Sequence, residues 1–490
     1  MRLASVKLSL DPRRSPDLVI LGVFQRSAPN TEGLPKRLAN AATRCCEAPG
    51  FKALEGQVQH AEAGGTQREM VEVHGLGTRA GFDDRKLRRW AAEVIEGAGK
   101  EGKKRVLLVA PDHPAAEGHG ALPLMTELML TGYRFERFRK PGPAKRVQEI
   151  RLLAPADQQE AYEAALPLAR KLASSVSWAR DLGNTPPNVA SPAWMAEQAV
   201  SMAKEFGLGV EVLGPDELSA KGMGGLLAVG GGSSRGPRFV RLEWGEQGET
   251  VALVGKGVTF DTGGISIKPS HGMEEMKYDK CGACNVLAIA RAVADLRLPL
   301  HLQAYVTLVE NMPGGSSYRP ADILRCYNGK SVEVMDTDAE GRLILADALA
   351  WAAESKPETL IEFSTLTGAA VVALGSHGAA LYSPHEELSG ELLAAGKLSG
   401  DRLGPMPLWQ EFREEMNGVH GDLRNLGGRW GGANTAAAFL SNFVGRVQRW
   451  AHIDIAGTAY EASRESGTSE ATGFGVPLTV DWLLRRTERF

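Results

Sequence analysis

The sequence predicts an α/β protein with a smaller N-terminal α/β domain and a larger α/β catalytic domain, built on a mostly parallel sheet flanked by helices. Two observations lead to this class. Apolar runs typical of buried strands alternate with helical patterns, an order that implies parallel strands with helices on both faces. The chain also has 490 residues, which is too long for one ordinary core, so two domains are expected.

The first domain is expected to span residues 1–150. Residues 18–24 and 105–110 have the apolar character of buried strands, and residues 122–138 have a helical pattern. Residues 139–143 contain two prolines and a glycine, which indicates a linker. No acidic cluster or glycine fingerprint occurs in this part of the sequence, so we assign it no chemistry.

A linking helix and the catalytic domain follow. Residues 155–182 are rich in Ala, Leu, Glu and Gln, so the segment 151–182 is expected to form one linking helix. The segment Gly-Asn-Thr-Pro-Pro-Asn at 183–188 ends it. The catalytic domain is expected over residues 183–490. Its predicted strands are 226–234 (running into a glycine-rich turn), 251–260, 301–310, 331–335 and 359–364.

Composition and charge limit the partners and the cellular compartment that we expect for this protein. The formal net charge of −3 argues against nucleic acid or an anionic membrane as the main partner. No apolar run approaches the ~20 residues of a membrane span, and no signal-peptide core precedes Asp11. The five cysteines are a sparse, odd set, unlike a secreted disulfide framework. The expected compartment is therefore the cytoplasm.

The stretch from Asp336 to Leu343, DTDAEGRL, carries three carboxylates and one guanidinium within eight residues. Thr337 lies three residues before Glu340, which has the form of a capping box and predicts that the stretch opens a helix. Acidic groups at a strand-to-helix junction lie where open α/β sheets place their active sites. Taken alone, however, the pattern is explained better by a well-capped helix with a solvated first turn.

A second stretch changes that balance. The almost uncharged run at 251–260 reads as a buried strand, yet it contains Lys256 and is followed by Asp261 and later by Asp279. Buried charges are normally paired or bound to metal, because leaving them unpaired costs several kcal/mol. These two carboxylates, with Asp338 and Glu340, supply four negative charges, which two divalent cations would neutralise. An uncharged Lys256 amine would then be a further ligand.

Six segments of the chain resemble the leucyl aminopeptidase (cytosol aminopeptidase) family of two-metal exopeptidases. They are RDLGNTPPN, VGKGVTFDTGGISIKP, MKYD, NMPGGSSYRPAD, DTDAEGRL and TLTGAAVVALG, and the resemblance extends from about Arg180 to Val476. The pair GKGVTFDTGG and DTDAEGRL at this separation is highly specific. In that family the N-terminal α/β domain contributes to assembly.

The resemblance implies a set of site residues. It implies one metal held by Lys256, Asp261, Asp279 and Glu340, and a second held by Asp261, Asp338 and Glu340 with the backbone carbonyl of Asp338. It implies that Lys268 stabilises the oxyanion, that Arg342 binds bicarbonate in place of a side-chain base, and that Asp279 also receives the substrate α-amine. The implied substrate pocket is Met276, Thr365, Leu366, Gly368 and Ala456.

The resemblance also implies what the protein acts on and how it assembles. The expected activity is release of N-terminal residues from peptides, with apolar ones such as leucine favoured, using water activated by two Mn²⁺ or Zn²⁺ ions. The expected assembly is a homo-hexamer of two stacked trimers, with active sites facing an interior cavity. The expected compartment remains the cytoplasm.

Several positions depart from the usual family pattern. Asp336 stands where asparagine is usual and adds a potential negative charge. Lys280 stands where methionine is commoner, and its ammonium is a candidate partner for that charge. Cys281 and Cys284 replace small residues, and Trp430 and Asn434 replace smaller or apolar groups. None of these changes removes an implied ligand, so they bear on pocket shape and metal preference.

Alternative interpretations remain open at this point. A nucleotide-binding reading of the glycine-rich turns is disfavoured, because no P-loop hydroxyl residue follows Lys256. Cys281-Gly-Ala-Cys284 lacks the further ligands of a zinc site and fits packing residues better, and His452 fits a hydrogen-bonded core histidine. A non-catalytic regulatory or nucleic-acid scaffold and a two-metal phosphoesterase are the rival functions.

Overall fold

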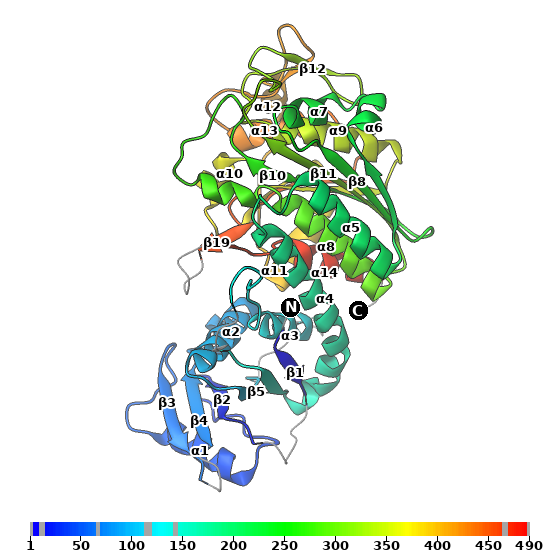
Figure 1. Cartoon of the computed structure of the whole chain (residues 1–490). Coiled ribbons are helices and arrows are strands. Elements are labelled where there is room, and N and C mark those ends of the chain that lie inside the picture. The colour runs from blue at the N-terminus through cyan, green and yellow to red at the C-terminus, as the bar shows by residue number, and fades with distance from the viewer. Residues whose placement is uncertain are drawn as a thin grey trace. The chain divides into compact units, whose positions relative to one another are not determined.

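The computed structural model of the chain describes residues 3–8, 15–64, 69–111, 120–140, 146–462 and 469–487. The chain divides into two compact units between Ser177 and Trp178, and both are α/β units (Figure 1). The predicted fold class, a smaller α/β domain followed by a larger one with a mostly parallel sheet, is confirmed.

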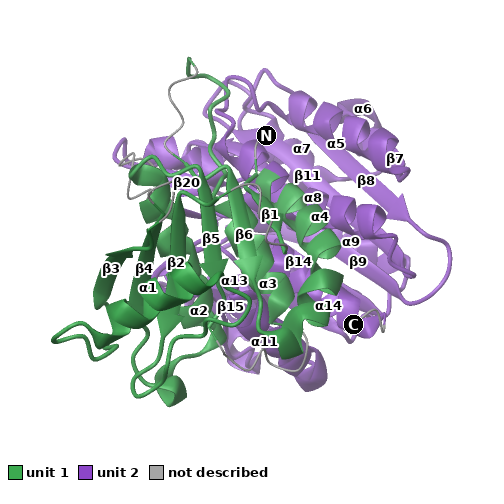
Figure 2. Cartoon of the chain, turned by 90° about the horizontal axis from the view of Figure 1, so that it is seen from below, with its two compact units in different colours: residues 1–177, 490 green, residues 178–489 purple. Residues whose placement is uncertain are grey.

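The first unit is built on a six-stranded sheet in the order β1-β6-β5-β2-β4-β3, drawn in green in Figure 2. Its strands are β1 (Ser5–Lys7), β2 (Leu18–Val23), β3 (Val58–Glu62), β4 (Met70–Gly75), β5 (Arg105–Val109) and β6 (Glu149–Leu153). Its helices are α1 (Lys36–Glu47), α2 (Asp84–Lys100) and α3 (Ala121–Leu130), with a 3-10 turn at Arg79–Gly81. All neighbouring strands are parallel except β3, which pairs antiparallel with β4 at the edge.

Two details of the first unit differ from the sequence-based prediction. The helix predicted over 122–138 is too long, because α3 ends at Leu130. The chain turns at Gly132, where a Cβ atom would lie 2.5 Å from the backbone nitrogen of Ala4. The strand β6 lies between β1 and β5 in the sheet, so the first unit extends past residue 150, where we expected the domain to end.

The helix α4 (Gln159–Asn184) follows a 3-10 turn at Ala156–Gln158 and covers most of the segment predicted as one long helix. The division between the two units falls within it, at Ser177, whereas the sequence analysis set residues 151–182 apart as a linking helix. Of the predicted linker at 139–143, residues 141–143 lie outside the described residues.

The second unit is built on a nine-stranded sheet in the order β16-β15-β18-β14-β9-β11-β8-β7, with β10 paired to β11. Its strands are β7 (Gly209–Leu213), β8 (Arg238–Trp244), β9 (Thr250–Gly255), β10 (Val258–Asp261), β11 (His301–Asn311), β14 (Thr359–Ser364), β15 (Ala379–Tyr382), β16 (Leu403–Pro405) and β18 (Trp450–Asp454). The central strands β18, β14, β9 and β11 run parallel, as does β10 beside β11. Antiparallel pairing occurs toward the edges, at β15–β18, β11–β8 and β8–β7.

Helices cover both faces of this sheet (Figure 1). The helices α5 (Pro192–Phe206), α8 (Cys281–Leu296), α11 (Glu386–Ser399) and α14 (Val476–Arg486) pack together on one face, and α7 (Gly224–Gly230), α9 (Gly341–Glu354) and α13 (Gly432–Leu440) on the other. Shorter helices are α6 (Pro215–Ala220), α10 (Gly368–Leu374) and α12 (Gln410–Glu414). Small sheets are formed by β12 (Ile323–Arg325), β13 (Ser331–Glu333) and β17 (Leu423–Arg424), and by β19 (Tyr460–Ala462) and β20 (Ser469–Ala471). Within the described ranges, no helix has the length and apolar character needed to cross a membrane.

Two strand predictions in the second unit are wrong in detail. Residues 226–234 begin in the helix α7, not in a strand, because Leu226 and Val229 pack into the core against α9 and the Leu226 amide donates to Asp347 Oδ2 at 2.9 Å. The run 251–260 forms two strands. It is interrupted at Lys256 and Gly257, where a Cβ on the glycine would lie 2.1 Å from the carbonyl oxygen of Thr307.

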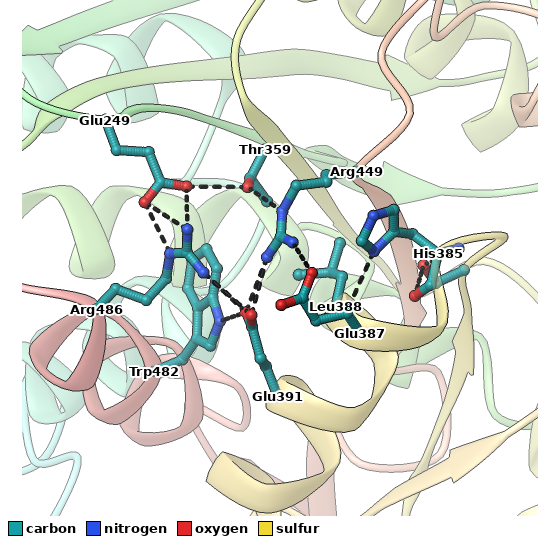
Figure 3. A network of polar contacts seen from close by, with 10 residues as sticks. Glu249, Thr359, His385, Glu387, Leu388, Glu391, Arg449, Trp482 and Arg486 are labelled. Atoms are coloured by element: carbon teal, nitrogen blue, oxygen red, sulfur yellow. Dashed lines mark hydrogen bonds and ion pairs between the residues drawn. The ribbon is translucent and has the colours of Figure 1, made fainter.

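A network of two arginines and two glutamates ties α14 and α11 to the sheet (Figure 3). Glu391 on α11 accepts from Arg449 at 3.0 Å, from Arg486 at 3.1 Å and from Trp482 Nε1 at 2.8 Å. Arg486 also forms a two-pronged contact with Glu249, at 2.7 and 2.8 Å. We call these five residues the Glu391 network. Charge-assisted and two-pronged contacts of this kind are the stronger hydrogen bonds in proteins.

Candidate active site

Asp261, the last residue of β10, is almost fully buried at the carboxyl edge of the sheet. Its Oδ1 accepts hydrogen bonds from the Gly263 amide at 2.9 Å and from Asn311 Nδ2 at 2.8 Å. Gly263 has a φ of 85°, and a Cβ there would lie 2.3 Å from the Ser266 carbonyl oxygen and 3.0 Å from Asp338 Oδ1. Glycine is therefore required where this turn approaches a second carboxylate.

The segment that carries Asp338 and Glu340 connects β13 to α9. The capping box predicted from Thr337 and Glu340 is wrong: Glu340 is itself the N-cap residue of α9, and the helix has no side-chain cap. The Thr337 hydroxyl instead donates to the Gly263 carbonyl at 2.6 Å and accepts from the Ser266 amide at 2.8 Å. These bonds join the turn after β10 to the segment before α9.

Three carboxylates converge at this junction. One oxygen each from Asp261, Asp338 and Glu340 lies within 4.8 Å of the other two, an arrangement that can hold a metal ion. Asp279 follows a 3-10 helix (Met273–Tyr278) and contacts the Lys256 ammonium, which also contacts Glu340. The structure thus brings together the five residues predicted as metal ligands, with Lys256 in contact with Asp279 and Glu340.

Two lysines bridge these carboxylates. The Lys256 ammonium lies 2.8 Å from Asp279 Oδ1 and 2.8 Å from Glu340 Oε1, and it donates to the Thr365 carbonyl at 2.9 Å. The Lys268 ammonium lies 2.9 Å from Asp261 Oδ2 and also contacts Asp338 Oδ1. The Lys256 side chain is 3% exposed and the Lys268 side chain 21%, so Lys268 is the one that solvent or a substrate can reach.

The site holds more negative than positive charge. Burial, which disfavours charge, and the neighbouring Glu340 raise the pKa of Asp261 to about 6. Burial also raises the pKa of Asp279 well above its ordinary value. Burial alone would lower the pKa of both lysines, but the surrounding carboxylates hold it above the ordinary value. Perturbed carboxylates of this kind mark a place that gains stability from added cations.

Asp279 gives the most direct indication that a cation fits. Its Oδ1 accepts from Thr365 Oγ1 at 2.7 Å and faces Lys256, whereas its buried Oδ2 has no hydrogen-bond partner among the described residues. A buried carboxylate oxygen without a partner is costly, and a metal ion satisfies it. Carboxylate oxygens are ligands that both Mn²⁺ and Zn²⁺ accept. The residues present therefore fit a divalent metal.

Arg342 lies in the first turn of α9 and is 5% exposed. Its Nη1 donates to the Asn425 carbonyl at 2.8 Å, while the buried Nε has no partner within the described part of the chain. Burial lowers the pKa of Arg342 to about 10. A buried guanidinium with an unused donor is suited to bind a small anion.

The residues predicted to contact substrate follow the carboxyl ends of β14 and β18. Asp454 at the end of β18 accepts from the amides of Leu366 at 3.0 Å and Ala456 at 3.1 Å, and from Thr367 Oγ1 at 2.7 Å. Thr365 is held in turn by its bond to Asp279. Asp454 thus ties the segment after β14, which carries Thr365 and Leu366, to the segment after β18, which carries Ala456.

The other two predicted pocket residues, Gly368 and Met276, lie outside these two segments. Gly368 is exposed and is the first residue of α10, directly after Thr367. Met276 is half-buried in the 3-10 helix that precedes Asp279. The Met276 carbonyl accepts from the Asp279 amide at 3.3 Å, which places Met276 beside one of the carboxylates.

The suggested pairing of Lys280 with Asp336 is wrong. Lys280 is fully buried, and its ammonium donates to the Gly183 carbonyl at 3.0 Å and to the Lys277 carbonyl. Burial lowers its pKa. Asp336 is half-buried, and its Oδ1 accepts from the Asp338 amide at 2.9 Å, so it orders the backbone of the segment that carries the carboxylates.

The residues that the sequence analysis left out of the site are indeed placed as core. His452 is fully buried and contacts Glu362 through Nδ1, with Tyr382 stacked on its ring. Cys281 and Cys284 are buried cysteines in the first turn of α8, as expected for packing residues.

Three residues of the site were missed. Asn311 ends β11 and donates to Asp261, Asp454 ends β18, and Asn425 both donates to the Asp336 carbonyl at 2.7 Å and accepts from Met335. The sequence carries a signal for the first two, since each is a polar residue that ends an apolar strand. Asn425 has no such signal, because its partners lie about 90 residues away in the chain.

Metal-dependent hydrolases typically have a carboxylate cluster at the carboxyl edge of a mostly parallel sheet. The cluster described here lies at such an edge and includes a buried carboxylate oxygen that has no hydrogen-bond partner among the described residues. Comparison with known families agrees. Residues 177–480 match the catalytic domain of the cytosol aminopeptidase family, and residues 20–142 match its N-terminal domain. The chain therefore belongs to the cytosol aminopeptidase family, and it is a metal-dependent aminopeptidase by class.

Individual relatives cover most of both chains. A probable cytosol aminopeptidase of Roseiflexus castenholzii is 44% identical over 427 residues, covering 84% of this chain and 87% of that protein. The cytosol aminopeptidase of Pseudomonas aeruginosa PAO1 is 41% identical over 430 residues, covering 86% of each. Among solved structures, the bottromycin maturation enzyme BotP in complex with Mn is similar with a TM-score of 0.84 and 31% identity, over 96% of this chain and 100% of that one.

Proposed function

We propose that this protein is a two-metal aminopeptidase that releases the N-terminal residue of peptides, with apolar residues such as leucine favoured. The observation that supports it most is the unpartnered Oδ2 of Asp279, beside three converging carboxylates and only two ammonium groups. Such a set accepts two divalent cations without further change in side-chain identity.

The proposed ligands divide into two sets. One cation would be held by Asp261, Asp279, Glu340 and Lys256, whose ammonium would release a proton to solvent so that its amine can bind the metal. The other would be held by Asp261, Asp338, Glu340 and the Asp338 carbonyl. Mn²⁺ or Zn²⁺ bound there would activate a water molecule and polarise the scissile carbonyl. The related BotP structure is described as a complex with Mn, which agrees with this choice of metals.

Side chains around the proposed metal site would bind the substrate and assist the reaction. Asp279 would receive the free α-amine of the peptide, which restricts cleavage to the first residue. Lys268, the more exposed lysine, would stabilise the developing oxyanion. Arg342 would hold bicarbonate as the proton-accepting group, which its unused Nε donor favours. Thr365 and Leu366, whose positions depend on Asp279 and Asp454, would line the pocket for the first side chain.

A pair of substrates tests the exopeptidase assignment. Leucine p-nitroanilide should be hydrolysed, and its N-acetylated form should not, because acetylation removes the amine that Asp279 would bind. Equal turnover of the two substrates would rule out an aminopeptidase. Activity should also be lost with a chelator and restored by Mn²⁺ or Zn²⁺.

A hexamer in the cytoplasm is the proposed assembly and location. Closed symmetric assemblies are the common form of homo-oligomers, and the family resemblance favours six chains. Six chains of 52.5 kDa would have a mass of about 315 kDa, which light scattering measures directly. A fully active species near 50 kDa would contradict the hexamer.

A further inference from the structure

The first unit, to which the sequence assigns no chemistry, contains a cavity of about 500 Å³ at the carboxyl edge of its sheet. Its walls come from the segments that follow β2, β4 and β6. The side chains that matter for binding are Phe24, Ser27, Asn30, Glu32, Arg79 and Asp157. All of them belong to the first unit.

The topology of the sheet places this cavity where ligands are expected. In the sheet, β2 lies between β4 and β5 and pairs parallel with both. After β2 the chain first forms β4 on one side of β2 and later forms β5 on the other side. Figure 2 shows β2 and β5 as neighbours in the green unit. Strand order thus reverses between β2 and β5, and open α/β sheets bind ligands in the crevice at that point. The cavity touches the ends of β2 and β6, the two neighbours of β5.

The polar groups around the cavity suit an anion joined to hydroxyl groups. The Arg79 guanidinium lies 5.0 Å above the ring of Phe24, a contact that holds the cation at the wall. A guanidinium matches the oxygens of a phosphate with two parallel hydrogen bonds. Glu32 and Asp157 supply carboxylate oxygens that accept from hydroxyl groups, and Asn30 accepts from the Glu32 amide at 3.2 Å.

A second cavity of about 420 Å³ adjoins the first and shares Phe24 and Ser27 with it. Its other walls include the apolar side chains of Cys46, Phe51 and Leu54. Phe51 is half-buried, packs against the core of the first unit and lines this second cavity. A polar compartment and an apolar one therefore meet at the end of β2.

We propose that these two adjoining cavities form a binding site for a mononucleotide. The phosphate lies at Arg79, the ribose hydroxyls face Glu32 and Asp157, and the base stacks beside Phe51. Together the cavities provide an anion-binding wall and an apolar wall. A mononucleotide would contact both walls, whereas a free phosphate or a simple amino acid would contact only one of them. Its residues all belong to the first unit, whereas the residues proposed for the peptidase chemistry all belong to the second.

Titration calorimetry of the full-length protein with ADP tests the proposal, with inorganic phosphate as the comparison ligand. We expect saturable binding of ADP and weaker binding of phosphate. Arg79→Gln should weaken ADP binding by about tenfold, the effect of losing one charge-assisted contact. Phe51→Ala should weaken ADP binding while leaving phosphate binding unchanged.

Arg89→Gln is the matched control, because Arg89 is an exposed arginine of the same unit that pairs with Glu55 and Glu93 outside the cavities. It should leave ADP binding unchanged. Turnover of leucine p-nitroanilide should be the same in all three variants and the wild type, so failure of the peptidase proposal would be seen separately. No saturable ADP binding at millimolar concentration, ADP binding unchanged in Phe51→Ala, or phosphate bound as tightly as ADP would each overturn the nucleotide site.

Discussion

The carboxylates of the candidate active site and those of the Glu391 network lie in the same unit but are neutralised differently. In the network, arginines make several direct bonds to each glutamate, and no oxygen of Glu391 is left over. In the active site, two lysines bridge four carboxylates, and an oxygen of Asp279 has no partner among the residues that the structure describes. The difference separates a structural cluster from one arranged to accept cations.

The pKa of Glu391 shows the same difference between the two clusters. Burial alone would raise the pKa of Glu391, but the Trp482 hydrogen bond and the two arginines hold it below the ordinary value. In the active site the net effect on Asp261 and Asp279 is the opposite, since burial and neighbouring carboxylates outweigh the lysines. Arginine contacts thus complete one cluster, whereas the other remains short of positive charge.

The largest effect is expected from Asp261→Ala, because Asp261 belongs to both proposed ligand sets. Loss of metal-based stabilisation, worth several kcal/mol, should reduce kcat/KM by more than about 10³-fold. Metal analysis of the purified variant should find less than the two ions per chain proposed for the wild type. Full metal content with lost activity would show that Asp261 is no ligand.

Lys268→Ala should lower kcat by roughly 10²–10³, the usual cost of removing an oxyanion partner. Its metal content should stay near two per chain, because Lys268 bridges carboxylates without being a proposed ligand. Metal content and kcat are therefore measured on the same preparation. An empty site in this variant would mean that Lys268 holds the cluster together and does not act on the substrate.

Asp454→Asn should have a smaller effect, about 10- to 100-fold on kcat/KM, as is typical of residues that position others. The amide can replace only part of the bonds that Asp454 accepts from Leu366, Thr367 and Ala456. The loss should be greater for leucine than for alanine substrates, since these residues line the proposed pocket. An equal loss for both substrates would indicate a general structural role.

Glu391→Gln should leave kcat unchanged at 25 °C and lower the free energy of unfolding by about 1–3 kcal/mol, the range for losing hydrogen bonds to a charged group. Denaturant unfolding measures this difference. Glu387→Gln serves as the control, because Glu387 is 70% exposed and contacts Arg449 alone in the network. Its effect on stability should be small.

The contribution of Glu391 should also depend on pH. Because its folded-state pKa lies below the ordinary value of 4.5, the stabilisation is present above about pH 4.5 and is lost as the pH falls through the folded pKa. The difference in stability between wild type and Glu391→Gln should therefore shrink below pH 4.5. A constant difference down to pH 3 would show that the charge of Glu391 does not matter.

Much of the fold was predictable because its signals are local. The apolar runs of β2, β5, β11 and β14 were placed within one or two residues, since buried parallel strands have long apolar segments. The errors arose where tertiary contacts decide. The run 226–234 begins as a helix because its apolar residues face α9, and the strand 251–260 breaks where Gly257 meets the Thr307 backbone.

By itself the sequence determined the fold class and the family, and it predicted which charged residues form the candidate site, because motif spacing and buried charge are visible in a linear chain. Only the tertiary structure decided how those charges meet. It paired Lys256 with Asp279 and Glu340 and bonded Lys280 to the Gly183 carbonyl. It also joined Asn311 to Asp261, Asn425 to Arg342 and Asp454 to Leu366 by hydrogen bonds. These contacts join residues that are mostly 50 to 100 positions apart, and such pairings follow from strand order and packing, which no local pattern encodes.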